Sequence, residues 1–360
     1  MEHTAAASET RLPMAPAQTA VRSYPPSWID RFMAWVQNRP LPYGLAYLGL
    51  LVLEVVLMHI LAWIDGNLPA FSFHRLYLLF PLWLWGPLFI MTYLDEVALH
   101  ALRDFQPLLG DHQGEIPRLQ YELTTLPARS VRLSSLIWSG VFVLLMYIGF
   151  PTVVRLYSYG PFGIASVWIF GLLTFVTGGA VYYHTIRQLR LVSQTIALVE
   201  RVNLFRLDPI YAFARLTAKA GVSWLLLSGV TLIIFPFELI NAVVIALYGT
   251  QVLFALGCFI LPLWNVHQRL VAEKRRLLAE VNRRVEAAIQ RLHQALDGDD
   301  LTRVKEVDTA LAGLRTERAM LEDIATWPWS TAAVSGFVSA LLLPIALFVI
   351  QMALRNLLGA

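Results

Sequence analysis

Long apolar stretches alternate with shorter, basic polar stretches along nearly the whole chain. A helix that crosses the hydrocarbon core of a bilayer needs roughly 20 apolar residues at 1.5 Å rise each. The fifth and sixth stretches are separated only by a turn at Pro236, so the count falls to six if that turn is absent. The pattern predicts seven membrane-spanning helices, at residues 43–63, 76–94, 136–157, 162–183, 222–237, 239–264 and 330–354.

The polar connections between these stretches also show helical patterning. Segments 95–135 and 184–221 are predicted to be helical, and 265–329 is predicted to be a hairpin of two helices with an acidic turn at Asp297-Gly298-Asp299-Asp300. The sixth span has no breaker between Trp264 and this hairpin, so it is expected to continue into it. The first hairpin helix carries a narrow apolar stripe at Leu270, Leu277, Val281, Val285, Ala288, Leu292 and Leu296.

Composition places the chain among membrane proteins. It is 57% hydrophobic and 15% charged, whereas a soluble domain carries about a quarter charged residues. We therefore predict an all-α polytopic membrane protein. Its parts are a disordered, cytoplasmic N-terminal tail (1–42), six spans with cytoplasmic connections (43–264), a cytoplasmic helical hairpin (265–329) and a last span (330–360). Residues 1–30 lack the apolar centre of a signal peptide, and we expect them to be disordered.

The distribution of lysine and arginine predicts an orientation. Every second connection is basic, and the hairpin segment alone has eleven such residues. By the positive-inside rule the N-terminus and the hairpin lie in the cytoplasm and the C-terminus lies outside. The preference for arginine over lysine points to a prokaryotic protein of the plasma (inner) membrane. Anionic lipid explains the basic excess of the hairpin more simply than nucleic acid does.

No motif predicts catalysis, a cofactor or a metal. The single cysteine, Cys258, cannot form an internal disulfide, and HExxH and CxxC motifs are missing from the sequence. Glu96, His100 and Asp104 are spaced i, i+4, i+8. They could hold a metal, but a solvated helix face is the favoured interpretation. We expect the protein not to be an enzyme.

Ionisable residues inside spans are functional candidates by default. Glu54 and His59 lie in the first span, and Glu54 is either a proton or cation site or a structural carboxyl paired with a neighbouring helix. Glu238 lies at the end of the sixth span and is expected to be interfacial. The spans contain no lysine for a retinal Schiff base.

The last span adds a local sequence pattern to this topology. Five apolar residues, Ala346 to Ile350, precede Gln351-Met352. The arrangement resembles the gustatory-type signature of Thr-Tyr, five apolar residues and Gln-Phe, with Pro344-Ile345 in place of Thr-Tyr and Met352 in place of Phe. With seven spans, an inside N-terminus and a hairpin before the last span, the chain resembles the seven-transmembrane ion channel superfamily, which includes insect odorant and gustatory receptors.

The resemblance implies a homotetrameric, ligand-gated cation channel. Its hairpins would form a central anchor through Val304, Leu311 and Leu314, and the last span would line the pore. Gln351 would be a polar pore residue and Phe348 an apolar gate, with Leu347 as the alternative gate. A small-molecule ligand would bind among aromatic residues: Tyr77, Phe80, Trp83, Tyr147, Phe150, Trp168 and Tyr248.

Two alternatives remain open. The last span could instead be a packing helix kinked at Pro344, with Ser335 and Ser339 as its contact face. The whole protein could be a membrane scaffold or sensor whose hairpin binds a partner, with Val304, Leu311 and Leu314 packed inside their own subunit.

Overall fold

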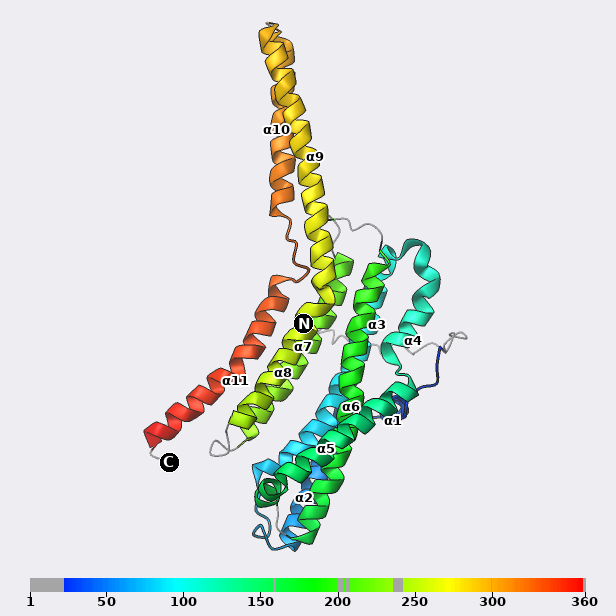
Figure 1. Ribbon diagram of the computed structural model, residues 1–360, viewed down its shortest axis with the longest axis vertical. Coiled ribbons are helices and arrows are strands. Elements are labelled where there is room, and N and C mark those ends of the chain that lie inside the picture. The colour runs from blue at the N-terminus through cyan, green and yellow to red at the C-terminus, as the bar shows by residue number, and fades with distance from the viewer. Residues whose placement is uncertain are drawn as a thin grey trace, which may run out of the picture.

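A computed structural model describes residues 23–157, 160–199, 204, 208–235, 242–298 and 300–358. These residues form helices and connections, with no β-strand in the described ranges (Figure 1). The α-helices are α1 (Trp28–Gln37), α2 (Tyr43–Ile64), α3 (Leu79–Phe105), α4 (Ile116–Thr124), α5 (Ala128–Tyr157), α6 (Pro161–Ala197), α7 (Asp208–Ile234), α8 (Ala242–Ile260), α9 (Trp264–Asp297), α10 (Leu301–Asp323) and α11 (Thr331–Leu358). Short 3-10 turns are η1 (Arg75–Leu78), η2 (Gln106–Leu108), η3 (Gly110–Glu115) and η5 (Leu261–Leu263).

Within the described residues, six helical stretches are long and apolar enough to cross a membrane. They correspond to the first six predicted spans, and the protein is therefore a polytopic helical membrane protein in architecture. The predicted fifth and sixth spans are separate helices, α7 and α8, which pack against each other. The seventh predicted span lies in α11, a helix of 28 residues.

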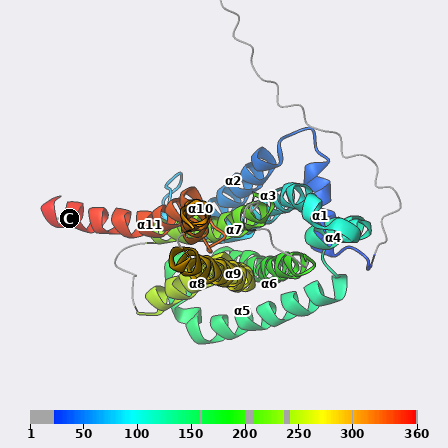
Figure 2. The ribbon, with the colours of Figure 1, turned by 90° about the horizontal axis from the view of Figure 1, so that it is seen from above.

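The bundle is organised around α3, α6 and α7. Helix α2 packs on α3, α5 packs on α6, and both α8 and α11 pack on α7 (Figure 2). The end from which α9 leaves is called here the hairpin end, and the opposite end, where α2 finishes and α6 begins, is called the far end (Figure 1). The central helices α3, α6 and α7 continue past the apolar stretches at the hairpin end, so the described part of connection 184–221 consists largely of extensions of spans, whereas connection 95–135 also contains the separate helix α4.

Local contacts fix where α6 begins. Pro161 occupies its first turn, where a missing N–H is harmless. The Asp65 carboxylate, at the end of α2, accepts backbone N–H groups of Phe162 and Gly163 at 3.3 and 2.6 Å. A Cβ on Gly160 would lie 2.1 Å from the Asp65 side chain, so only glycine leaves room for this cap. The far end of the bundle is thus held by a carboxylate on a helix N-terminus.

Helix α1 lies within the segment 1–42 that was expected to be a tail. Ser27 and Asp30 form a capping box at its start, and Ile29, Met33 and Val36 are buried. The Asp30 carboxylate also accepts the N–H of Leu126 at 3.1 Å, and burial raises the pKa of Asp30. The prediction of disorder for this segment is therefore wrong for residues 28–37, because the apolar face of α1 finds a partner surface on the bundle.

The predicted hairpin is formed by α9 and α10, which pack along each other and project from the bundle (Figure 1). Asp300 caps α10 by accepting the N–H of Arg303 at 3.1 Å. Val281 and Ala288 of the predicted stripe are buried, but Leu296 is 51% exposed and the neighbouring Ala295 is buried in its place. Positions 288, 292 and 295 keep the spacing of four and three residues, so the stripe ends at Ala295 and not at Leu296.

Candidate functional site

Helix α11 is attached to the bundle along one narrow face. A Cβ on Gly221 of α7 would lie 2.7 Å from Phe337, and a Cβ on Gly229 would lie 2.5 Å from Pro344, so the two glycines let α11 approach closely. Phe337, Ala340 and Pro344 are buried on this face. Figure 2 shows α11 extending away from the other helices beyond this contact. The last predicted span is therefore the least enclosed of the apolar helices that pack on α7.

The opposite face of α11 has no partner in the described part of the chain. We call it the free stripe: Ser335, Ser339, Leu342, Ala346 and Ala353, all exposed. The alternative in which Ser335 and Ser339 form the contact face inside the subunit is wrong, because Phe337 and Pro344 make that contact. Large aliphatic side chains dominate the exposed faces of α2 and α5, and they also flank the free stripe at Val338, Leu343 and Ile345, but the free stripe itself is mostly small and partly polar.

The three predicted pore and gate residues lie in the second half of α11. Leu347 is half-buried, three residues beyond the buried Pro344. The side chains of Phe348 and Gln351 lie outside the described ones, and their roles stay predictions. Position 351 follows Pro344 by two helical turns, which places it in line with the α7 side of the helix and not with the free stripe.

Five aromatic rings connect the base of the hairpin to α11. His267 of α9 stacks on Trp327 at 3.8 Å between ring centroids, and Trp327 stacks on Trp329 at 4.9 Å. Trp329 stacks on Phe259 of α8 at 4.7 Å, and Phe259 stacks on Phe337 of α11 at 4.3 Å. We call this the aromatic stack. It runs without a break from the hairpin, through the α10–α11 connection, to the membrane helix that follows.

Hydrogen bonds fasten the same junction. Lys274 Nζ donates to the carbonyls of Glu322 and Ile324 at 2.6 and 2.8 Å, which closes the base of the hairpin. His267 Nδ1 lies 3.0 Å from the Thr326 carbonyl. The sequence interpretation missed this junction, although Trp327-Pro328-Trp329 directly before an apolar span was an available signal. Two large rings held by a proline are costly in solvent and indicate a packed connection.

The aromatic residues predicted to bind a ligand do not form one group. Tyr77 and Phe80 belong to a small hydrophobic cluster toward the far end, together with Phe142, on whose ring Trp168 packs edge-on at 5.5 Å. Trp83 instead faces α7, where its Nε1–H donates to Thr231 at 2.8 Å. Tyr147 is 85% exposed, Tyr248 is half-buried on α8, and the Phe150 side chain lies outside the described ones.

Both ionisable residues of the first span are held by neighbours. Trp85 Nε1–H donates to Glu54 Oε2 at 2.7 Å, and Glu54 is buried. His59 Nε2 accepts the N–H of His74 at 3.1 Å, so its proton lies on Nδ1, which faces the Val55 carbonyl at 2.8 Å. These contacts join α2 to α3 and to the η1 turn. Glu238 lies outside the described residues.

A buried polar cluster that the sequence interpretation missed lies at the hairpin end. Asp95 of α3 is 2.8 Å from His184 Nε2 of α6 and accepts from Gln188 Nε2 at 3.1 Å. Gln188 also donates to the Leu123 carbonyl at the end of α4. The cluster therefore ties α3, α6 and α4 together. Its signal in the sequence was weak, since one of its members is a single aspartate beside the more conspicuous Glu96.

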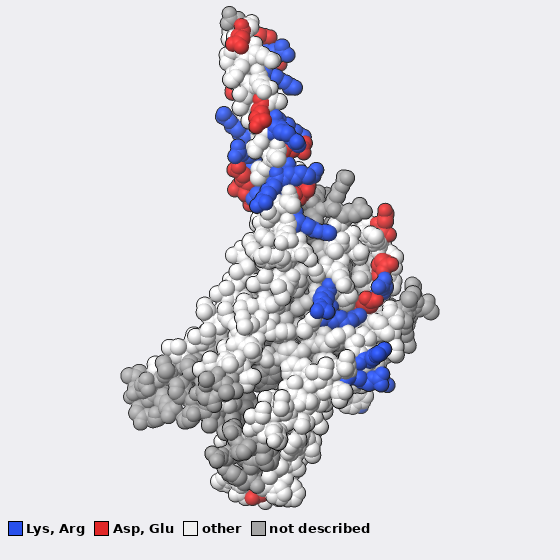
Figure 3. Space-filling view, in the orientation of Figure 1, with Lys and Arg blue, Asp and Glu red and all other residues white. Residues whose placement is uncertain are grey.

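The predicted anchor residues pack within their own chain. Leu311 is buried, and Val304 and Leu314 are half-buried, on the helix that packs along α9. The exposed surface of the hairpin is instead charged, as Figure 3 shows for the projecting arm. Contacts between hairpins of neighbouring subunits, if they form, would use this charged surface and exposed residues such as Met320, which is 61% exposed.

Taken together, the described residues define a helical polytopic membrane protein with a projecting helical arm, whose base is joined to α11 by the aromatic stack. Comparison of the sequence and structure with protein-family models, with curated proteins and with solved structures gives no match. The resemblance to seven-transmembrane channels therefore depends on topology and on the partial pattern in the last span.

Proposed function

We propose that this chain is the subunit of a homotetrameric, ligand-gated cation channel whose pore is lined by the free stripe of α11. The observation that carries the proposal is the attachment of α11 along one face, mainly to α7 with Phe259 of α8 beside it, which leaves a small, partly polar stripe uncovered. Four copies arranged around an axis could bring four such faces together, as closed symmetry in homo-oligomers requires.

The charge distribution supports the expected orientation. In Figure 3, Lys and Arg gather on the hairpin and on the adjoining part of the bundle, and the lower part of this face is nearly free of them. By the positive-inside rule, the hairpin end faces the cytoplasm and the far end faces outward. In this orientation the aromatic stack links a cytoplasmic arm to the pore helix. Movement of the hairpins could then be transmitted to the pore helix through the aromatic stack.

The pore residues implied by the resemblance and those exposed on the free stripe are different sets. Ser339 and Ala346 represent the free stripe, and Phe348 and Gln351 represent the resemblance. Each can be changed to cysteine after Cys258→Ala removes the only native thiol. Charged thiosulfonate reagents react with the ionised thiolate, which forms in water and not in lipid.

We expect Ser339→Cys and Ala346→Cys to react and to lose current in planar bilayers. The matched controls are Leu53→Cys on α2 and Leu144→Cys on α5, whose native side chains are 63% and 56% exposed. Both should stay unreactive because they face lipid. If Ser339→Cys and Ala346→Cys react no faster than these controls, the free stripe does not line an aqueous path. If only Phe348→Cys and Gln351→Cys react, the pore is lined by the face of α11 that carries positions 348 and 351.

The oligomeric state is an independent test. Native mass measurement of the detergent-solubilised protein should give four copies, and a reversal potential that follows the cation gradient should accompany the current. A stable monomer without current would leave the alternative function, a membrane scaffold or sensor whose charged hairpin binds a partner. The small aromatic cluster around Tyr77 and Phe80 is the proposed ligand region.

A further inference from the structure

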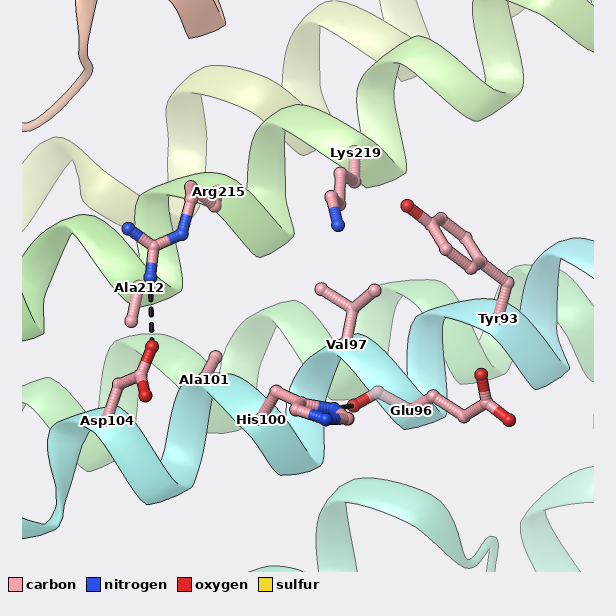
Figure 4. A pocket seen from close by; sticks show the side chains of 9 residues that line it. All are labelled: Tyr93, Glu96, Val97, His100, Ala101, Asp104, Ala212, Arg215 and Lys219. Carbon is pink, nitrogen blue, oxygen red and sulfur yellow. Dashed lines mark hydrogen bonds and ion pairs between the residues drawn. The ribbon is translucent and has the colours of Figure 1, made fainter. Parts of the chain in front are cut away.

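A cavity of about 370 Å³ lies between α3 and α7 at the hairpin end (Figure 4). This volume is in the range of small-ligand sites. Its polar lining is formed by Tyr93, Glu96, His100 and Asp104 of α3 and by Arg215 and Lys219 of α7. Glu96, His100 and Asp104, the candidate metal site or solvated face of the sequence analysis, thus lie opposite Arg215 and Lys219. Neither the resemblance nor the proposed function uses this cavity.

Both carboxylates of the cavity already have partners. Arg215 forms an ion pair with Asp104 at 2.9 Å. The Tyr43 hydroxyl donates to Glu96 Oε2 at 3.1 Å. Among the described residues there is no group of three side chains that could hold a metal ion, so the metal interpretation of this face has no geometric support. The charge of Asp104 is therefore offset by Arg215, and the Glu96 carboxylate points away from Lys219 (Figure 4).

The remaining polar groups are suited to an anion. Figure 4 shows the Lys219 ammonium pointing into the space between the two helices, with the Tyr93 hydroxyl directed toward the same space. Lys219 Nζ lies 5.3 Å from the centre of the Tyr93 ring and has no ion pair with any described residue. His100 Nδ1 donates to the Glu96 carbonyl at 2.7 Å, so Nε2 of the neutral ring can accept a hydrogen bond from a hydroxyl of a ligand.

The depth of the cavity indicates where the anion comes from. Tyr43 is the first residue of the apolar helix α2. Because Tyr43 donates a hydrogen bond to Glu96, Glu96 lies at the depth where the first membrane span starts. His100 lies roughly 6 Å farther along α3, at 1.5 Å per residue, which is the depth of lipid headgroups. Basic pockets between membrane helices bind anionic headgroups in other proteins.

We propose that this cavity binds the headgroup of an anionic phospholipid, with its phosphate on Lys219 and Tyr93 and a headgroup hydroxyl donating to His100 Nε2. The ammonium of Lys219 donates to the phosphate oxygens, and the pair formed by Arg215 and Asp104 closes one side of the cavity. The site is independent of conduction. A protein that conducts without binding lipid here, or that binds lipid without conducting, would separate this proposal from the proposed channel.

Lipid titration of the purified full-length chain tests the site. Phosphatidylglycerol added to the protein in neutral detergent should raise its Tm, because a ligand that binds only the folded state stabilises it. We expect Lys219→Gln to weaken this binding roughly tenfold, the loss expected for one charged hydrogen bond. Lys219→Arg should retain most of the binding. Phosphatidylcholine, which has no net charge, should have a much smaller effect.

Lys305→Gln is the matched control, because Lys305 is an exposed lysine on α10 of the hairpin. It should bind phosphatidylglycerol like the wild type. The proposal is wrong if Lys219→Gln binds phosphatidylglycerol with wild-type affinity, or if Lys305→Gln loses as much affinity. A second titration uses inorganic phosphate in place of lipid. If it raises the Tm of the wild type but not of Lys219→Gln, the site is a phosphate site that also takes the free ion.

Discussion

At the scale of single residues, a few glycines decide how closely the helices meet. Gly179 of α6 would place a Cβ 2.7 Å from the Ser134 carbonyl of α5, and Gly229 of α7 would place one 2.5 Å from Pro344. Gly140, in contrast, has no atom within 4 Å of such a Cβ. The sequence contains 21 glycines and does not show which of them lie against another helix. A glycine is required only where a neighbouring helix leaves no room for a Cβ.

The effect of an added methyl group at two of these positions should therefore differ in sign. Gly229→Ala forces Pro344 and α11 to move, and we expect it to lower the free energy of unfolding by about 1–3 kcal/mol. Gly140→Ala, the control, adds helix propensity in open space and should be neutral or stabilising by up to about 1 kcal/mol. Unfolding of both variants in mixed micelles measures the difference. Equal effects would show that α11 does not pack closely at Gly229.

At the scale of elements, the long helices and the hairpin followed from the apolar pattern, but the junctions between them did not. Pro262 lies in η5, where α8 passes into α9, so the sixth span and the hairpin are joined by a short 3-10 turn. The connection between α10 and α11 is ordered by Trp327 and Trp329. Ring stacking between distant segments has no periodicity along the chain, so hydrophobic patterning could not predict it.

Trp327→Ala should loosen the link between the hairpin and α11. It removes the ring that contacts both His267 and Trp329, and each such aromatic pair contributes roughly 0.5–1.5 kcal/mol. Spin labels at Ala279→Cys on α9 and Ala332→Cys on α11, with Cys258→Ala, report the distance between the two helices. We expect a broader distance distribution than in the parent protein.

Trp35→Ala provides the control for that experiment. Trp35 lies on α1, is 49% exposed and takes no part in the aromatic stack, so its loss should leave the distance distribution unchanged. An unchanged distribution in Trp327→Ala as well would mean that the hydrogen bonds of Lys274 and His267 hold the junction without the stack.

At the scale of the whole molecule, apolar helices and charge separate into two regions. The bundle presents large aliphatic residues on α2 and α5, and the hairpin presents charged ones (Figure 3). A soluble protein would cover these aliphatic faces. The separation predicts that the bundle is embedded in lipid and the hairpin stands in water. Which aqueous side it occupies follows from the positive-inside rule alone.

Labelling of intact cells tests this orientation. Ala70 is exposed in the connection after α2 at the far end, and Ala310 is exposed on α10. With Cys258→Ala as the background, an impermeant maleimide should label Ala70→Cys in intact cells and Ala310→Cys only after lysis. The reverse pattern would place the hairpin outside and would contradict the proposed cytoplasmic arm.

The sequence by itself determined the helical class, the six long apolar helices, the hairpin and its acidic turn, because these depend on composition and on periodicity within single segments. Tertiary structure decided which faces meet. It ordered α1, placed Leu311 inside the hairpin, paired Asp95 with His184, and turned Pro344 rather than Ser339 toward α7. Each outcome depends on the shape of a neighbouring helix. In a membrane protein nearly every helix face is apolar, so hydrophobicity alone does not distinguish a lipid contact from a helix contact.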